Sequence, residues 1–91
     1  MNVQSLPDIT PNGATVPLST DPNIAATFVS VMASATGARV GGPTCGPNEG
    51  LLLTDDKYDF YPPNYDQGLY YLSKIFVYAP AGTTKISVIY G

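Results

Sequence analysis

The sequence predicts an all-β protein, either a small β-sandwich or a jelly-roll-like barrel of about six or seven short antiparallel strands. Nine glycines and nine prolines interrupt the 91-residue chain so often that long helices have little room. The segments between them alternate apolar and polar residues with a period of two, and they are rich in β-branched and aromatic residues. A chain of this length corresponds to one domain.

Residues 1–13 contain two prolines and a glycine and have no periodic apolar pattern, which predicts an extended N-terminal arm or a disordered tail. Val3, Leu6 and Ile9 are the apolar residues of this arm and candidate contacts with a neighbouring molecule. We expect the arm to become ordered by adding backbone hydrogen bonds at a neighbour's sheet edge. Its removal should then weaken attachment and leave the sandwich, residues 14–91, folded.

The first predicted strand runs from Ala14 to Leu18, and Pro17 predicts either an edge strand or the end of the strand. The second runs from Ala25 to Ala35, where two sets of residues alternate: Phe28, Ser30 and Met32 with Val29, Val31 and Ala33. Gly37 permits a turn into Arg39 and Val40, which predicts a hairpin.

The second half begins with a strand at Leu51–Leu53. Thr54–Gly68 is polar and aromatic and predicts a long loop with one short strand near Asp59–Tyr61. The last two strands, Ser73–Ala79 and Lys85–Tyr90, are joined by a five-residue, glycine-containing connection and predict a hairpin.

Composition and charge exclude several functions. The net charge is −3 and the four cations are scattered, whereas a nucleic-acid-binding protein needs clustered positive charge. There is no apolar run of about 18 residues to span a membrane, and no secretory leader is visible. A single cysteine suits a reducing cytoplasm.

Charged residues make up 12% of the chain, about half the usual fraction. A surface with few charges costs little to desolvate, which favours assembly, and we expect a homo-oligomer.

The residues of catalysis and metal binding are scarce. The chain has no histidine, so a serine or cysteine nucleophile lacks its usual base. Cys45 has no cationic neighbour in sequence and is interpreted as a small, inert residue. The acids Asp55, Asp56, Asp59 and Asp66 match no calcium-loop spacing and are interpreted as a solvated loop. We therefore expect a protein that is not an enzyme and holds no cofactor or metal.

An aromatic cluster between positions 58 and 71 is a candidate interface: Tyr58, Phe60, Tyr61, Tyr65, Tyr70 and Tyr71. Tyrosine offers a large contact area with a polar tip and loses little side-chain entropy on binding. The same residues could instead cap the core, or form a sugar-binding platform with the nearby Asn and Asp side chains. The sequence leaves these three interpretations open.

The order of segments resembles small virion proteins of tailed bacteriophages, in particular head-decoration (capsid cement) proteins. The resemblance covers Val16–Gly91 and rests on four stretches: VPLSTDP at 16–22, VSVMASATGARVGG at 29–42, GPNEGLLL at 46–53 and LSKIFVYAPAGTTKISVIYG at 72–91. It is weakest over Thr54–Gly68, where similar proteins have a shorter polar turn.

This resemblance implies a β-sandwich, made in the host cytoplasm, that coats the capsid surface of the virion. Its implied partner is the major capsid protein, and trimers on symmetry axes would lock neighbouring shell subunits together. Two alternatives stay open, namely a phage tail or fibre component and a carbohydrate-binding β-module.

Overall fold

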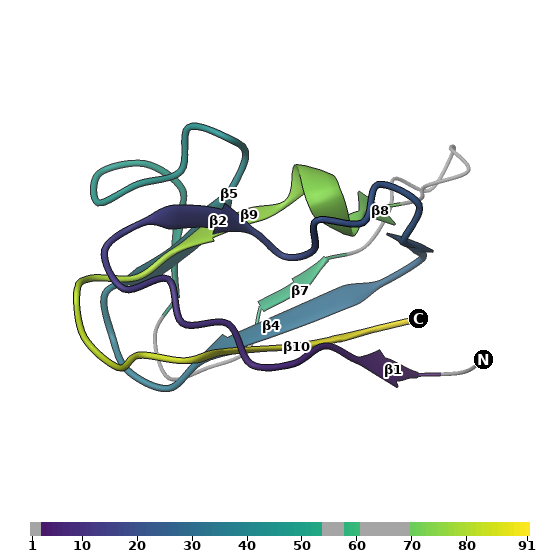
Figure 1. The fold of residues 1–91 in the computed structure, drawn as a ribbon, viewed down its shortest axis with the longest axis horizontal. Coiled ribbons are helices and arrows are strands. Elements are labelled where there is room, and N and C mark those ends of the chain that lie inside the picture. The colour runs from purple at the N-terminus through teal and green to yellow at the C-terminus, as the bar shows by residue number, and fades with distance from the viewer. Residues whose placement is uncertain (1–2, 54–57, 61–69) are drawn as a thin grey trace.

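The structure is a computed structural model that describes residues 3–53, 58–60 and 70–91, with 58–60 described by their backbone alone. Two four-stranded antiparallel sheets face each other as the layers of a sandwich (Figure 1), and a two-stranded sheet lies at one end. The predicted all-β fold, a small β-sandwich, is therefore confirmed. Within the described residues, no helix is long and apolar enough to cross a membrane.

Each layer has a simple strand order. The first sheet contains, in spatial order, β1 (Gln4–Ser5), β10 (Ile86–Tyr90), β4 (Val29–Ala33) and β7 (Tyr58–Phe60). The second contains β2 (Thr15–Pro17), β9 (Phe76–Tyr78), β5 (Ala38–Gly41) and β6 (Leu51–Leu53). The small sheet pairs β3 (Ala25–Ala26) with β8 (Tyr70–Tyr71), and a 3-10 turn, Leu72–Lys74, follows β8.

The strand pairs are nested like the two arms of one long hairpin. β1 pairs with β10, β2 with β9, β3 with β8, β4 with β7 and β5 with β6, all antiparallel. The chain reverses between β5 and β6, at residues 42–50. Two further pairs, β10 with β4 and β5 with β9, roll this hairpin into two layers. This is the strand order of a jelly roll.

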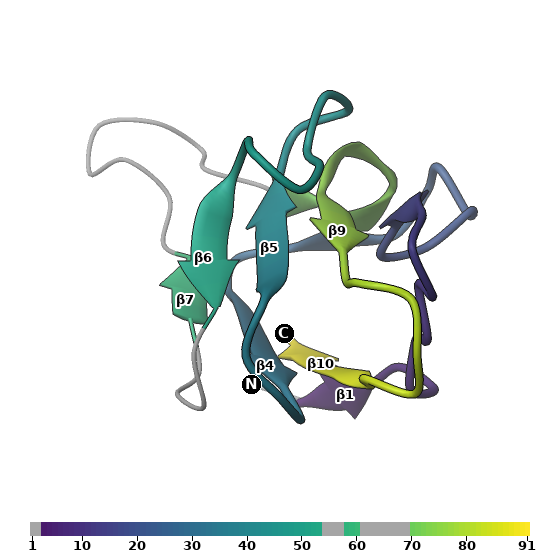
Figure 2. The same cartoon turned by 90° about the vertical axis from the view of Figure 1, so that its left-hand side faces the viewer.

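The two predicted hairpins are wrong, although their strands exist. β4 and β5 follow each other in the chain but lie in different sheets, and so do β9 and β10. Figure 2 shows the chain crossing from β9 in one layer to β10 in the other. The physical reason is that a short connection can join strands across the sandwich as well as within a sheet. An apolar face is buried equally well in both arrangements.

Strand positions agree more closely with the sequence pattern. The strand at Leu51–Leu53 is confirmed, and β7 lies one residue before the predicted Asp59–Tyr61. The strand predicted over Ser73–Ala79 is shorter, because Ser73 and Lys74 belong to the 3-10 turn. The described residues contain ten strands rather than about six or seven. Three of them have only two residues, a length that alternation cannot reveal.

The core lies between the two large sheets. Val29, Val31 and Val88 of the first layer, together with Val40 and Val77 of the second, are almost completely buried. The small sheet and the 3-10 turn extend this core at one end, where Ala26 and Leu72 are buried. The inward residues of β4, β10 and β9 alternate with outward ones, as the period of two predicts.

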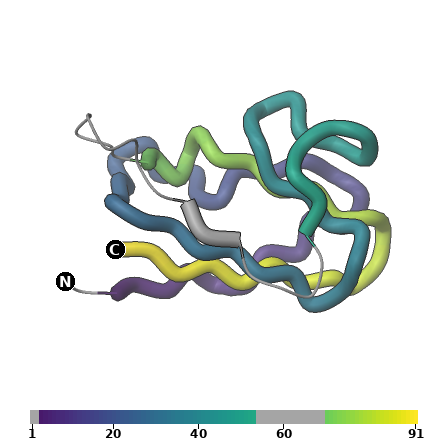
Figure 3. The backbone as a smooth tube through the Cα atoms, turned by 180° about the vertical axis from the view of Figure 1, so that it is seen from behind, coloured from purple at the N-terminus to yellow at the C-terminus, as the bar shows by residue number. Residues whose placement is uncertain are grey.

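The N-terminal segment is extended, as predicted, and it is paired within its own chain. Gln4 and Ser5 pair with Tyr90 and Ile89 of β10. Figure 3 shows the N-terminal segment running beside the C-terminal one. Leu6 and Ile9 pack against the core, so this segment is an edge of the sandwich in the structure.

A bulge interrupts the pairing of this segment with β10. The Leu6 amide donates a hydrogen bond to the Val88 carbonyl oxygen. Ile9 and Ile86 form a reciprocal pair, in which the amide of each donates to the carbonyl oxygen of the other. Pro7 and Asp8 therefore lie opposite one residue of β10, Ser87. A bulge suits Pro7, which has no N–H to contribute to the ladder.

Candidate functional site

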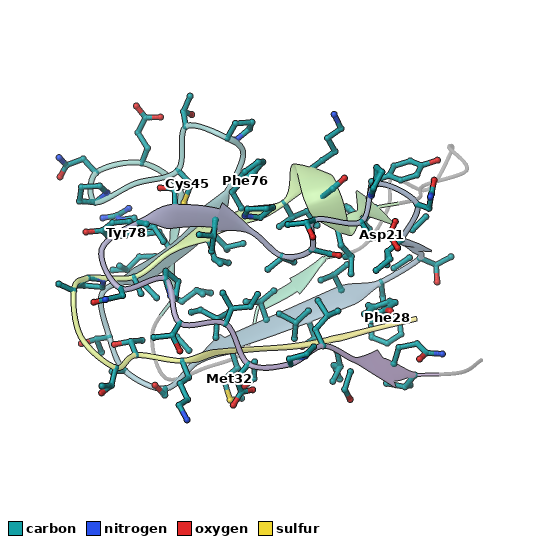
Figure 4. All side chains as sticks on the ribbon, viewed as in Figure 1. Asp21, Phe28, Met32, Cys45, Phe76 and Tyr78 are labelled. Carbon is teal, nitrogen blue, oxygen red and sulfur yellow. The ribbon has the colours of Figure 1, made fainter. Side chains whose placement is uncertain are left out.

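The candidate site is the outer face of the sheet formed by β1, β10 and β4, which we call the outer groove face. The register places Ser87 beside Met32 and Ile89 beside Ser30, with Ser5 on the other side of Ile89. Their inward neighbours on β4 and β10 are buried in the core, so these residues point away from it. In Figure 4 the Met32 side chain extends outward from the lower layer.

Two large apolar side chains on this face are exposed. Met32 is 44% and Ile89 43% exposed, although both belong to strands whose other face forms the core. Ser30, between β10 and β7, is only 8% exposed. Exposed apolar side chains that adjoin on one sheet face mark a candidate interaction surface, whereas single ones are ordinary.

A groove of about 340 Å³ runs along this face. Its lining residues come from β1 and the bulge, from β4 and from β10: Ser5, Leu6, Asp8, Ser30, Met32, Ser87, Val88 and Ile89. Asp8 is the one ionisable residue of this lining, and its carboxylate accepts a 3.4 Å hydrogen bond from the Ser87 hydroxyl. The groove thus combines thioether and aliphatic surface with hydroxyl groups, a composition that suits a protein surface with little charge.

The predicted contacts of the arm occupy three different environments. Leu6 lines the groove and also packs against the core, and Ile9 packs against the core. Val3 is exposed beside β1. The structure therefore places the arm next to the candidate site, but two of its three apolar side chains contact their own chain.

The predicted aromatic cluster is described in part. Tyr70 is half-buried and packs against the core, whereas its neighbour Tyr71 is 46% exposed. Both belong to the small sheet, away from the outer groove face (Figure 1). The backbones of Tyr58 and Phe60 lie in β7, and Tyr61 and Tyr65 lie outside the described residues.

The opposite sheet carries aromatic residues on its own outer face. Val77 of β9 is buried, so Phe76 and Tyr78 point outward, and both are half-buried. Arg39 lies beside Tyr78 in the register, and its guanidinium donates a 2.9 Å hydrogen bond to the carbonyl oxygen of Gly50. Two aromatic rings and one guanidinium thus share this face.

Cys45 is buried in the 42–50 connection, where its carbonyl oxygen accepts a hydrogen bond from the Thr15 hydroxyl. Burial raises the pKa of the Cys45 thiol. The Arg39 guanidinium lowers it to a smaller extent, and the Glu49 carboxylate adds to the rise. A thiol that is kept protonated in this way is a poor nucleophile.

Within the part of the chain that the structure describes, no three His, Cys, Asp or Glu side chains gather closely enough to hold a metal ion.

The sequence contained a signal for this face, although Met32 and Ile89 were not among the candidate residues predicted from it. The alternation in residues 28–33 already put Met32 opposite the core valines, and Ile89 likewise alternates with Val88. What the pattern lacked was the register that brings the two residues onto adjacent strands.

The fold and the site together define a small jelly-roll protein with an apolar groove on one sheet. Comparison of the chain with protein-family models, curated proteins and solved structures finds no match.

Proposed function

We propose that the protein is a non-enzymatic structural component of a tailed-phage virion, which decorates the capsid and stabilises it by binding across shell subunits. The observation that carries the proposal is the outer groove face, where Met32 and Ile89 are exposed in a lining with one carboxylate. Covering such a face removes apolar surface from water and displaces the hydration of few charges. The resemblance to head-decoration proteins names the partner, the major capsid protein.

The fold is compatible with this role. Jelly rolls form many viral capsid domains, and also many lectins, so the fold alone supports the proposal only by analogy. A homo-oligomer, trimeric as the resemblance implies, would present several copies of the outer groove face to the shell. Several weak contacts acting together would then give strong attachment.

The first test is quantitative mass spectrometry of purified virions of the source phage. A copy number near that of the major shell protein would support decoration. A few copies per particle would overturn the capsid position in favour of the tail, and absence from virions would overturn the virion role.

A variant pair tests the face itself. Ile89→Lys places a charge on the outer groove face, and Leu52→Lys places the same charge on the opposite sheet, where Leu52 is 54% exposed. We expect the first variant to lose binding to undecorated shells and the second to retain it, with both folded by circular dichroism. Equal binding by the two variants would contradict a contact through the outer groove face.

A second candidate, a carbohydrate-binding module on a tail or free in solution, is favoured by Phe76 and Tyr78 on the outer face of β9. Paired aromatic rings beside Arg39 could stack on a sugar and donate hydrogen bonds to its hydroxyls. Glycan-array binding that Tyr78→Ala abolishes and Tyr71→Ala leaves intact would support this function. An array without signal would remove it.

A further inference from the structure

The turn that follows the N-terminal segment carries a chemically reactive pair, Asn12 and Gly13, and both residues are exposed. Asparagine is a thermolabile residue, and its side-chain amide is lost most readily when glycine follows. Glycine has no side chain to block the approach of its own amide nitrogen to the asparagine side chain. The other asparagines of the chain precede larger residues: Asn2, Asn23, Asn48 and Asn64 are followed by valine, isoleucine, glutamate and tyrosine.

The deamidation of such a pair needs water and no other reagent. The Gly13 amide nitrogen gives its proton to hydroxide and attacks Cγ of Asn12. The new bond closes a succinimide ring while the bond from Cγ to the side-chain nitrogen breaks, and that nitrogen takes a proton from water and leaves as ammonia. Water then opens the ring at either carbonyl, which leaves aspartate or isoaspartate at position 12.

The native turn suits this pair of residues. Asn12 has a φ of 52° and Gly13 a φ of 83°, and the Ala14 amide donates a 3.2 Å hydrogen bond to the Pro11 carbonyl oxygen. Two positive φ values closed by such a bond define a type I′ turn, in which Asn-Gly is the favoured pair. The fold therefore uses the reactive pair in a conformation that the pair prefers.

Residues 79–82, which follow β9, engage both reacting groups. The Gly13 amide donates a 2.7 Å hydrogen bond to the Ala79 carbonyl oxygen, so the proton that the reaction removes is already bonded. The Gly82 amide donates a 2.9 Å hydrogen bond to the Asn12 side-chain oxygen, which holds the carboxamide against a different residue. Attack requires the nitrogen and Cγ to come together in a specific geometry, so these contacts must open first.

We propose that Asn12 is a deamidation site controlled by the fold. It is protected while the 11–14 turn lies on residues 79–82, and it reacts when this contact opens locally, without unfolding of the sandwich. Isoaspartate adds a carbon atom to the main chain, which a type I′ turn does not accommodate, so this product leaves the N-terminal segment without its anchoring turn. The inference goes beyond the proposed function and does not depend on it, since it concerns the purified chain alone.

The first test compares the folded full-length chain with the same chain in guanidinium chloride, at one pH and temperature. Mass spectrometry of proteolytic peptides measures the loss of the Asn12 amide, and chromatography separates the isoaspartate product. We expect the folded chain to react more slowly by about tenfold or more, because two hydrogen bonds must break first. The other asparagines are internal controls and should stay intact over the same period. Equal rates in the two states, or no reaction in guanidinium chloride, would overturn the proposal.

A variant pair then separates local opening from global unfolding. Gly82 has a φ of 139° and nothing within 4 Å of an added Cβ, so Gly82→Ala strains the segment that holds the turn without creating a clash. Gly50→Ala introduces strain at a φ of 103° in the 42–50 connection, outside the turn and residues 79–82. Circular dichroism checks that both variants are folded.

We expect Gly82→Ala to raise the deamidation rate of the folded chain several-fold and to leave the rate in guanidinium chloride unchanged. Gly50→Ala should leave both rates unchanged, although it lowers the stability of the sandwich. Equal acceleration by the two variants would show that the reaction requires global unfolding. No acceleration by Gly82→Ala would show that residues 79–82 do not control the site, and either result would overturn the proposal.

Discussion

At the scale of single residues, the 42–50 connection depends on Gly50. Its φ is 103°, and a Cβ atom there would lie 2.8 Å from the Cys45 sulfur and 3.0 Å from the Val40 carbonyl oxygen. We expect Gly50→Ala to lower the free energy of unfolding by about 1–3 kcal/mol. Gly42→Ala is the control, because nothing lies within 4 Å of the added methyl. Urea unfolding should show that Gly42→Ala lowers the free energy of unfolding by less than about 0.5 kcal/mol. Equal losses of stability in the two variants would contradict the close contacts described at position 50.

The Cys45 thiol predicts a pH dependence. Because burial raises its pKa in the folded protein, folding favours the protonated form. The resulting stability is fully present below the unfolded pKa of about 8.5, and it is lost as pH rises toward the folded value. We expect the wild type to lose stability above pH 8.5 relative to Cys45→Ala, measured by urea unfolding at several pH values. A constant difference between the two proteins across that range would refute this expectation.

At the scale of elements, β6 lies at a sheet edge and has one side chain in the core. Leu53 is 2% exposed and pairs with buried Ala38, whereas Leu52 points outward beside Arg39. Leu53→Ala should lower the free energy of unfolding by about 2–5 kcal/mol, because it removes buried apolar surface and leaves a cavity. Leu52→Ala removes the same atoms from the same strand and should stay within about 0.5 kcal/mol. Thermal or urea unfolding of both variants measures this, and a similar loss in each would show that β6 is oriented differently.

At the scale of the whole molecule, the nested strand pairs should make folding slow. β1 pairs with β10 through Gln4 and Tyr90, near opposite ends of the chain, whereas β5 and β6 are the pair closest in sequence among the described strands. Each outer pair closes a longer loop than the pair inside it, and that loop entropy opposes folding before the contact forms. We expect refolding in milliseconds to seconds, measured by stopped-flow tyrosine fluorescence. Refolding in microseconds would indicate a core built from local contacts.

The position of the N-terminal segment also has a consequence for the whole molecule. The sequence predicted an arm whose removal would leave the sandwich folded. In the structure Leu6 and Ile9 pack against the core and the segment covers the edge of β10. Removal of residues 1–13 is therefore expected to destabilise the sandwich, since it uncovers apolar surface and unpairs a strand edge.

The sequence by itself determined the fold class, most strand positions and which side of each strand is buried. The reason is local, because glycine and proline end segments and alternation separates two faces, as with Val29 and Val31 against Ser30 and Met32. It also named Leu6 as a candidate contact, and the structure places Leu6 in the lining of the outer groove face.

Only the tertiary structure decided which strands pair. Alternation is satisfied whether a strand pairs with its neighbour in sequence or faces it across the core, so both predicted hairpins were wrong. The outer groove face depends on that choice, because the pairing of β10 with β4 brings Ile89 and Met32 onto one surface. Contacts between residues more than fifty positions apart decide the site, and no local pattern in the sequence encodes them.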